Sequence, residues 1–177
     1  EILTCDWSSD VCSSDLIEAA RDLAGLEGAG TTEIGSPKHP VIGLMTEWIK
    51  GNQVETRAAD GDMGGTMRLG AYPARLEPGS RVADVYGTTE ISERHRHRYE
   101  VNNQYLDRLK NAGLCVAGYT RNEHPCEMVE LPGHDWFVAS QFHPEFTSTP
   151  REGHPLFISY VRAAIEQSER TRAARAA

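Results

Sequence analysis

Apolar positions along most of the chain follow either helical or strand spacing. Apolar residues at 16, 20, 23 and 24 fall on one face of a helix, which is therefore predicted to start at Leu16. Similar spacing predicts helices over 103–114 and from about Pro155. Strands are predicted over 40–45, 66–76, 115–120, 126–132 and 136–142. Because helices and strands are interspersed, the pattern predicts an α/β fold.

Other stretches lack clear periodicity. Residues 28–40 are rich in Gly, Ser and Pro and are predicted to form a loop. Residues 53–59 alternate only weakly, and the Gly-rich residues 59–65 are predicted to be a turn or a mobile loop. Within the strand 66–76, Pro73 indicates an edge or a bulge, because proline cannot donate a ladder hydrogen bond.

The two ends of the chain differ in composition from its middle. Residues 1–15 are rich in Ser and Asp, and residues 5–15 resemble translated sequencing-adaptor DNA fused to a shortened gene, with a disordered natural tail as the alternative. The last residues are polar and are expected to fray. We therefore expect a non-native or disordered segment at 1–15, a partial domain at 16–168 and a polar tail at 169–177.

Bulk composition excludes several classes of protein. A net charge of −8 argues against nucleic-acid binding, which needs an excess of Lys and Arg. No apolar run approaches the ~20 residues that span a bilayer, so no membrane partner is expected. The four cysteines form neither a CxxC pair nor a Cys/His zinc pattern, so we expect no metal site. With no visible secretory signal, reduced thiols and a cytoplasmic location are expected.

The stretch QFHPEF places two complementary polar groups after an apolar run. His143 follows a predicted strand, and Glu145 lies two residues further on. A carboxylate that accepts from one ring nitrogen leaves the other nitrogen able to take up a proton, which is a general-base arrangement. The alternative is an ordinary histidine near a surface turn.

Arginines and histidines alternate in ERHRHRYEVNN. If the segment is extended, Arg94, Arg96 and Arg98 share one face and His95 and His97 the other. This pattern fits a clamp for an anionic ligand or a solvated basic edge strand about equally well. Two other segments carry weaker signals: GDMGGTMRLG lacks the ending of a phosphate-binding loop, and Thr31–Glu33 is better interpreted as a helix cap than as a ligand carboxylate.

Taken together, four stretches resemble one family: VIGLMTEW, GGTMRLGAYP, ERHRHRYEVNN and QFHPEFTSTPREGHPLF. They are similar to the C-terminal glutamine amidotransferase domain of the CTP synthases, over about residues 16–168. The resemblance implies a class I glutamine amidotransferase-like, flavodoxin-like three-layer sandwich. Its sheet would be mixed and mainly parallel, and the domain would be truncated at its N-terminus.

The resemblance also implies roles for individual residues. In this family a cysteine attacks the side-chain amide of L-glutamine to form a glutamyl thioester and release ammonia. His143 matches the histidine that moves the proton, and Glu145 the glutamate that orients it. Arg98 matches the residue that pairs with the substrate α-carboxylate, and Glu33 an acidic residue of the glutamine pocket. The ammonia would pass to a separate synthase domain, absent from this chain, which aminates UTP to CTP.

Further expectations concern the cofactors and assembly of such a parent enzyme. ATP and Mg²⁺ would serve the synthase domain, and no cofactor is expected in the amidotransferase domain itself. The parent is expected to be a homotetramer.

The nucleophile that the resemblance implies is not found in the chain. The family's Gly-x-Cys-Leu-Gly-Met-Gln elbow would place the cysteine near Ser9, and Cys12 is out of register between Val11 and Ser13. Cys115 and Cys126 begin predicted strands, where a thiol is expected only to fill space. We therefore expect a chain that does not hydrolyse glutamine. The alternatives are a glutamine-binding pseudoenzyme and a related enzyme that uses Cys12.

Overall fold

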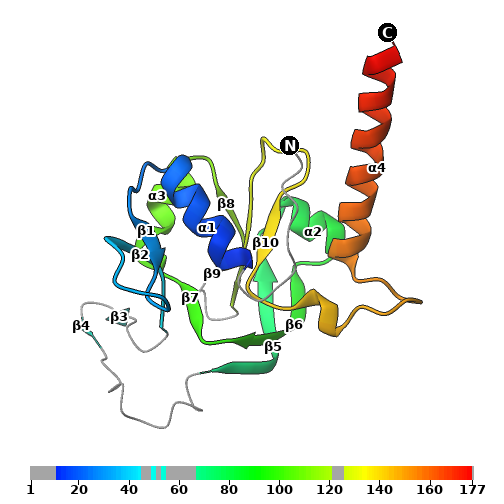
Figure 1. Cartoon of the computed structure of the whole chain (residues 1–177). Helices are drawn as coiled ribbons and strands as arrows, with labels where there is room; N and C mark the ends of the chain where they lie inside the picture. The colour runs from blue at the N-terminus through cyan, green and yellow to red at the C-terminus, as the bar shows by residue number, and fades with distance from the viewer. Residues whose placement is uncertain (1–10, 45–48, 51–52, 55–66, 121–125, 177) are drawn as a thin grey trace.

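The structure is a computed structural model that describes residues 11–44, 49–50, 53–54, 67–120 and 126–176. Helices and strands are interspersed along these residues (Figure 1). The helices are α1 (Val11–Asp22), α2 (Arg81–Tyr86), α3 (Leu106–Asn111) and α4 (Pro155–Ala176), with 3₁₀ turns η3 (Asn103–Tyr105) and η4 (Pro144–Phe146). The strands are β1 (Ala29–Thr31), β2 (His39–Leu44), β3 (Ile49–Lys50), β4 (Gln53–Val54), β5 (Arg68–Leu76), β6 (Glu90–His97), β7 (Tyr99–Val101), β8 (Cys115–Thr120), β9 (Cys126–Glu130) and β10 (Val138–Ser140).

The described strands form a five-stranded sheet, a three-stranded sheet and a short hairpin. The large sheet has the order β10-β9-β8-β5-β6, and all its neighbours are antiparallel. The small sheet has the order β1-β2-β7, in which β1 and β2 are parallel. A mixed α/β fold is confirmed, but among the described strands the expected parallel pairing is limited to β1–β2. Consecutive strands such as β8, β9 and β10 are joined by short connections, which suit antiparallel pairs; parallel pairs need long crossovers.

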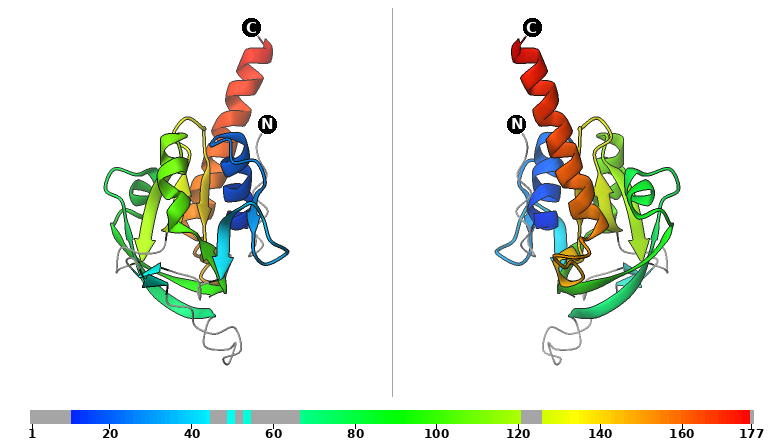
Figure 2. Two further views of the ribbon diagram at one scale, coloured as in Figure 1. Left: turned by 90° about the vertical axis from the view of Figure 1, so that its left-hand side faces the viewer. Right: turned by 90° about the vertical axis from the view of Figure 1, so that its right-hand side faces the viewer.

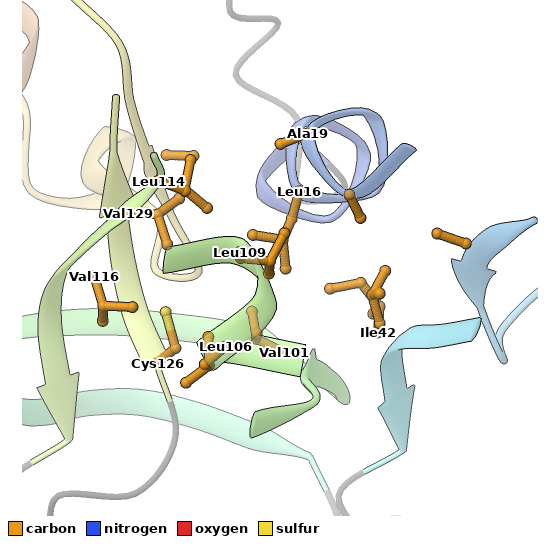
Figure 3. Packing of buried hydrophobic residues seen from close by; sticks show 14 of the residues in the cluster. Leu16, Ala19, Ile42, Val101, Leu106, Leu109, Leu114, Val116, Cys126 and Val129 are labelled. Carbon is orange, nitrogen blue, oxygen red and sulfur yellow. The ribbon is translucent and has the colours of Figure 1, made fainter. Parts of the chain in front are cut away.

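Helices cover both faces of the large sheet, as a three-layer sandwich requires. Neighbouring residues on a strand point to opposite faces, and Val116 and Val129 belong to one buried cluster whereas Ala117 and Met128 belong to the other. The first cluster contains the apolar faces of α1 and α3, and the second contains α2 and the start of α4. Figure 3 shows the first cluster, in which Leu16 of α1 approaches α3 and the strands.

The helices at the two ends differ from the predicted ranges. Helix α1 begins at Val11, ahead of the predicted start at Leu16. Helix α4 begins at Pro155 as predicted, continues to Ala176 and projects from the body of the protein (Figures 1 and 2). The polar tail is therefore helical up to Ala176, while the domain boundaries proposed at 15/16 and 168/169 stay predictions.

Several observed elements were not predicted from the sequence, among them β1, α2 and β7. Strand β1 lies inside the predicted loop 28–40. Helix α2 lies in a segment for which no element was predicted. The Ser80 hydroxyl accepts a hydrogen bond from the Ala83 N–H at 3.1 Å, and Gly87 ends the helix with φ of 69°. Strands β2, β5, β8, β9 and β10 and helix α3 confirm the predicted elements. Most of residues 53–59 and all of 59–65 lie outside the described residues.

No helix in the described part of the chain is long and apolar enough to cross a membrane.

Candidate active site

His143 and Glu145 form a hydrogen-bonded pair just beyond the end of β10. His143 caps the short turn η4, and Pro144 separates the two residues. The Nδ1 atom of His143 lies 2.6 Å from Oε1 of Glu145. The His143 side chain is 8% exposed and that of Glu145 40%, so the carboxylate lies at the surface and the ring beneath it.

This arrangement fixes which nitrogen of His143 can act as a base. A carboxylate can only accept a hydrogen bond, so Nδ1 of His143 donates its proton to Glu145. In the neutral ring, Nε2 then carries the lone pair, and it is buried with no hydrogen-bond partner among the described residues. The Phe146 ring stacks on His143 at 5.0 Å with an interplanar angle of 20°. The pair can therefore take a proton at Nε2 from a group brought to it.

Backbone hydrogen bonds hold this loop against the large sheet. The His143 N–H donates to the Arg94 carbonyl in β6 at 2.8 Å, and the Gln141 N–H donates to the Glu127 carbonyl in β9 at 2.9 Å. The Gln141 side chain also donates to the Cys126 carbonyl and accepts from the Val101 N–H. The position of His143 thus depends on strands β6, β7 and β9.

Strand β6 shows the predicted alternation of its two faces. Arg94 and Arg96 are exposed, whereas His95 between them is 1% exposed. Both arginines line an open cavity of about 540 Å³, together with Leu69 and the Phe146 ring that stacks on His143. The exposed arginine face of β6 therefore adjoins the His143 loop.

Arg98 is the single residue between β6 of the five-stranded sheet and β7 of the three-stranded sheet. Glu33 follows β1, and its N–H donates to the Thr31 hydroxyl in a turn; no helix follows, so the predicted helix cap is wrong. Because β1 is parallel to β2 and β2 is antiparallel to β7, the end of β1 and the start of β7 lie at the same end of the small sheet. The topology thus brings Glu33 and Arg98 to one edge, while their roles stay predictions.

Comparison with known proteins identifies the family of the chain. The family model described as "Glutamine amidotransferase class-I" matches residues 27–163. The chain belongs to the class-I glutamine amidotransferase family. Proteins named CTP synthase are similar to this amidotransferase: one from Brucella anthropi is 60% identical over 152 residues, and one from Azospirillum brasilense is 58% identical over 156. Each match covers 86% of this chain and 28% of the relative, so the chain spans well under a third of the relatives' length.

A solved structure agrees with the fold. It is titled as the glutaminase domain of Trypanosoma brucei CTPS with bound acivicin, and it is similar with a TM-score of 0.73 and 34% sequence identity. The match covers 87% of this chain and 57% of that one. The resemblance to the amidotransferase domain of CTP synthases and the three-layer α/β class are therefore confirmed.

A buried network of titratable groups lies on the inner face of β6 of the amidotransferase, and no sequence pattern predicted it. We call it the His95 cluster; its members are Arg68, His95, His97, Glu100 and Glu127. Nη1 of Arg68 donates to Glu127 at 2.6 Å and to Glu100 at 3.2 Å. Nδ1 of His95 lies 2.8 Å from Nε2 of His97. Four of the five residues are at most 6% exposed.

Burial shifts the protonation of this cluster strongly. Burial and the Arg68 charge lower the pKa of His95 to about 2 and that of His97 to about 4. Burial raises the pKa of Glu127 to about 7 and also raises that of Glu100, although Arg68 opposes both shifts. At neutral pH both histidines are therefore uncharged.

Strand β5 buries the face that carries an arginine. The apolar-looking side, with Leu69 and Pro73, is exposed, and Leu69 is 66% exposed. The opposite side is buried and carries Arg68. Burial of Arg68 is tolerable because its guanidinium donates hydrogen bonds to side-chain oxygens of Glu100 and Glu127.

A second buried cluster connects β6 to the segment that follows η4. Nε2 of His154 donates to Oε1 of Glu93 at 2.9 Å, because its Nδ1 accepts from the Leu156 N–H. The Tyr86 hydroxyl donates to the same Glu93 oxygen at 2.8 Å, and burial raises the pKa of Tyr86. Glu93 therefore ties α2 and the start of α4 to the strand that holds the His143 loop.

The structure describes the side chains of two cysteines, Cys115 and Cys126, and Cys126 does not resemble an activated nucleophile. Cys126 is buried, and burial raises the pKa of its thiol, which disfavours the thiolate. Cys115 is exposed, so the expectation that it fills space in the core is wrong. Ser9, the position nearest the expected nucleophile, lies outside the described residues. No group of three or more His, Cys, Asp or Glu residues suited to a metal ion occurs among the described residues.

Proposed function

We propose that this chain is part of the glutaminase domain of a CTP synthase, which supplies ammonia from L-glutamine for the ATP-dependent amination of UTP to CTP. The observation that carries the proposal is the His143–Glu145 pair, whose Nε2 is buried and available to a proton. Further support comes from the amidotransferase family match and from relatives named CTP synthase. The chain matches 28% of those relatives, so the complete reaction would need the rest of such an enzyme.

The proposed mechanism gives each site residue one task. His143 takes a proton from an attacking thiol at Nε2 and later returns it to the departing ammonia, while Glu145 holds the ring and stabilises its charged form. Arg98 binds the α-carboxylate of glutamine, and Glu33 contributes to the pocket on the same sheet edge. Arg98 lies four residue positions after Arg94, the backbone partner of His143, so the two regions lie on the order of 13 Å apart along the extended chain.

The thiol itself is not supplied at the expected place. No Gly-x-Cys-Leu-Gly-Met-Gln stretch occurs in the sequence, and Ser9 stands near the position where its cysteine belongs. We propose that the chain as written does not hydrolyse glutamine by itself. ATP and Mg²⁺ would act in a synthase domain of the homotetrameric parent, for which this chain provides no residues.

A hybrid enzyme tests the proposed function. Residues 27–163 would replace the matched region of the Brucella anthropi relative, which would contribute its own upstream segment and the remainder of the enzyme. The expected result is CTP formation with either L-glutamine or ammonium as nitrogen source. CTP formation with ammonium but not with glutamine would contradict the proposal, provided that the grafted domain unfolds cooperatively on heating, because ammonium-dependent turnover reports only on the synthase domain.

The unaltered chain tests the absence of hydrolysis. We expect no ammonia release from L-glutamine and no covalent adduct of 6-diazo-5-oxo-norleucine at any cysteine. An adduct at Cys12 together with ammonia release would contradict this expectation. Glutamine binding by calorimetry without ammonia release would instead indicate a non-hydrolysing binding module.

A further inference from the structure

The hydrogen-bond directions within the His95 cluster can be followed from one end. The Tyr99 carbonyl can only accept, and it lies 3.0 Å from Nδ1 of His97, so His97 donates from that atom. Its Nε2 is then an acceptor in the neutral ring. Since His95 Nδ1 lies 2.8 Å from this acceptor, His95 must donate from Nδ1. Because the neutral His95 ring carries its proton on Nδ1, its Nε2 has no proton and can only accept a hydrogen bond.

Nε2 of His95 faces a carboxylate oxygen that also lacks a partner. It lies 3.6 Å from Oε2 of Glu127, and neither atom has a hydrogen-bond partner among the described residues. Both side chains are fully buried, at 0% exposure. Two facing acceptors with no proton between them would repel each other and stay unsatisfied, which is costly in the interior. A shift of about 0.5 Å would close a hydrogen bond if one of them carried a proton.

We propose that His95 and Glu127 share one proton, carried by Oε2 of Glu127, and that this neutral pair is a positioning element for the base His143. The proton satisfies both orphaned atoms at once. It also leaves the cluster electrically balanced, with one positive charge on Arg68 and one negative charge on Glu100. Loss of the proton leaves two buried carboxylates facing one guanidinium.

Both members of the pair contact the loop that ends in His143. The His95 ring meets the Phe142 ring edge-on at 6.0 Å, and the Glu127 carbonyl accepts the Gln141 N–H. Arg94, next to His95, accepts the His143 N–H. The three residues 141–143 thus each depend on the pair or on its neighbour. We expect a change in the pair to reach the base through the His95–Phe142 ring contact, because the other two contacts are made by backbone carbonyls.

Charged and titratable groups surround the pair on every packed element. Arg68 comes from β5, His97 from β6, Glu100 from β7 and His143 from the loop after β10. Cys126 adjoins Glu127 on β9, and Lys110 of α3 acts on Cys126. Tyr72 adds an aromatic edge against His95. Arg68 is the cation within the His95 cluster, so removal of the shared proton changes that cluster from neutral to negative.

Spectroscopy of the unaltered chain tests the proton directly, without any assay of activity. Imidazole ¹⁵N spectra at pH 6, assigned with His95→Gln, are expected to show His95 neutral with its proton on Nδ1. Isotope-edited infrared spectra are expected to show a protonated carboxyl band that disappears in Glu127→Gln and fades as the pH rises to 8. A charged His95 ring, a proton on its Nε2, or an ionised Glu127 at pH 6 would overturn the proposal.

The positioning role rests on the proposed function and is tested in the hybrid enzyme. Glu127→Gln keeps a donor toward His95 and is expected to retain the glutamine-dependent kcat. Glu127→Ala removes the donor and is expected to lower the glutamine-dependent kcat by as much as ~10²-fold, with ammonium-dependent turnover unchanged. Equal effects of the two substitutions, or a change in KM alone, would overturn the positioning role. A hybrid that never uses glutamine would refute the proposed function instead, and the spectra would still decide where the proton lies.

Discussion

Replacement of Glu127 by glutamine should stabilise the protein above neutral pH, which is the opposite of the usual effect of breaking a buried ion pair. Burial raises the pKa of this carboxyl from 4.5 to about 7. The folded protein therefore holds the proton more tightly than the unfolded chain, and stability falls as the pH rises from about 4.5 through about 7. At ~1.4 kcal/mol per pKa unit, the full loss is about 3 kcal/mol.

Glutamine mimics the protonated carboxyl and cannot ionise, so the variant avoids this loss. At pH 8 we expect Glu127→Gln to be more stable than the unaltered chain by about 2–3 kcal/mol, and at pH 5 the difference should shrink to under ~1 kcal/mol. Below about pH 6.5 both proteins should lose stability. The unfolded chain protonates His95 and His97 in this range, whereas the folded chain does not, because burial lowers their pKa values to about 2 and about 4.

Urea unfolding at pH 5, 6.5 and 8 provides the measurement. Glu152→Gln, an exposed carboxylate in the segment after η4, is the matched control and should change stability by less than ~0.5 kcal/mol at each pH. If pairing with Arg68 instead kept Glu127 ionised down to pH 5, Glu127→Gln would destabilise the protein by about 3–5 kcal/mol at pH 5 as well as at pH 8. That result would refute the reasoning.

Three further substitutions test other parts of the account. Glu145→Gln in the hybrid enzyme should lower glutamine-dependent kcat by ~10²-fold or more, because the His143 ring loses its charged partner, whereas Glu152→Gln should leave steady-state kinetics unchanged. Arg98→Lys should raise the KM for glutamine about tenfold with less effect on kcat, because lysine cannot make a bidentate contact with a carboxylate. An unchanged KM would exclude Arg98 from the glutamine pocket. Leu109→Ala should destabilise the chain by ~2–5 kcal/mol in chemical denaturation, because Leu109 is 1% exposed, whereas the exposed Leu23→Ala should have little effect.

Local sequence patterns predicted the elements that depend on the spacing of neighbouring residues. Strand β8 was predicted with its observed bounds, and the His143–Glu145 pair follows from two residues separated by one proline. Helix α2 is only six residues long and depends on the caps Ser80 and Gly87, so its apolar pattern is too short to detect. Strand β1, with three residues in a Gly-rich segment, gives no pattern at all.

Long-range contacts explain the larger errors. The burial of Arg68 on β5 was not predicted, because its partners lie 32 and 59 residues further along the chain. No local pattern reveals that Glu100 and Glu127 converge on one guanidinium. The neutral state of His95 has the same origin, since it depends on burial created by several strands. The resemblance to a family supplied Glu33 and Arg98, and their roles await kinetic tests.

The central claim is that His143 is the base of a glutaminase site, and one ratio tests it most directly. In the hybrid enzyme, the rate of CTP formation with L-glutamine is divided by the rate with ammonium, for the unaltered hybrid, for His143→Ala and for the control His134→Ala in the β9–β10 connection. The account predicts that the ratio falls by ~10²-fold or more in His143→Ala alone. An unchanged ratio in His143→Ala would contradict it.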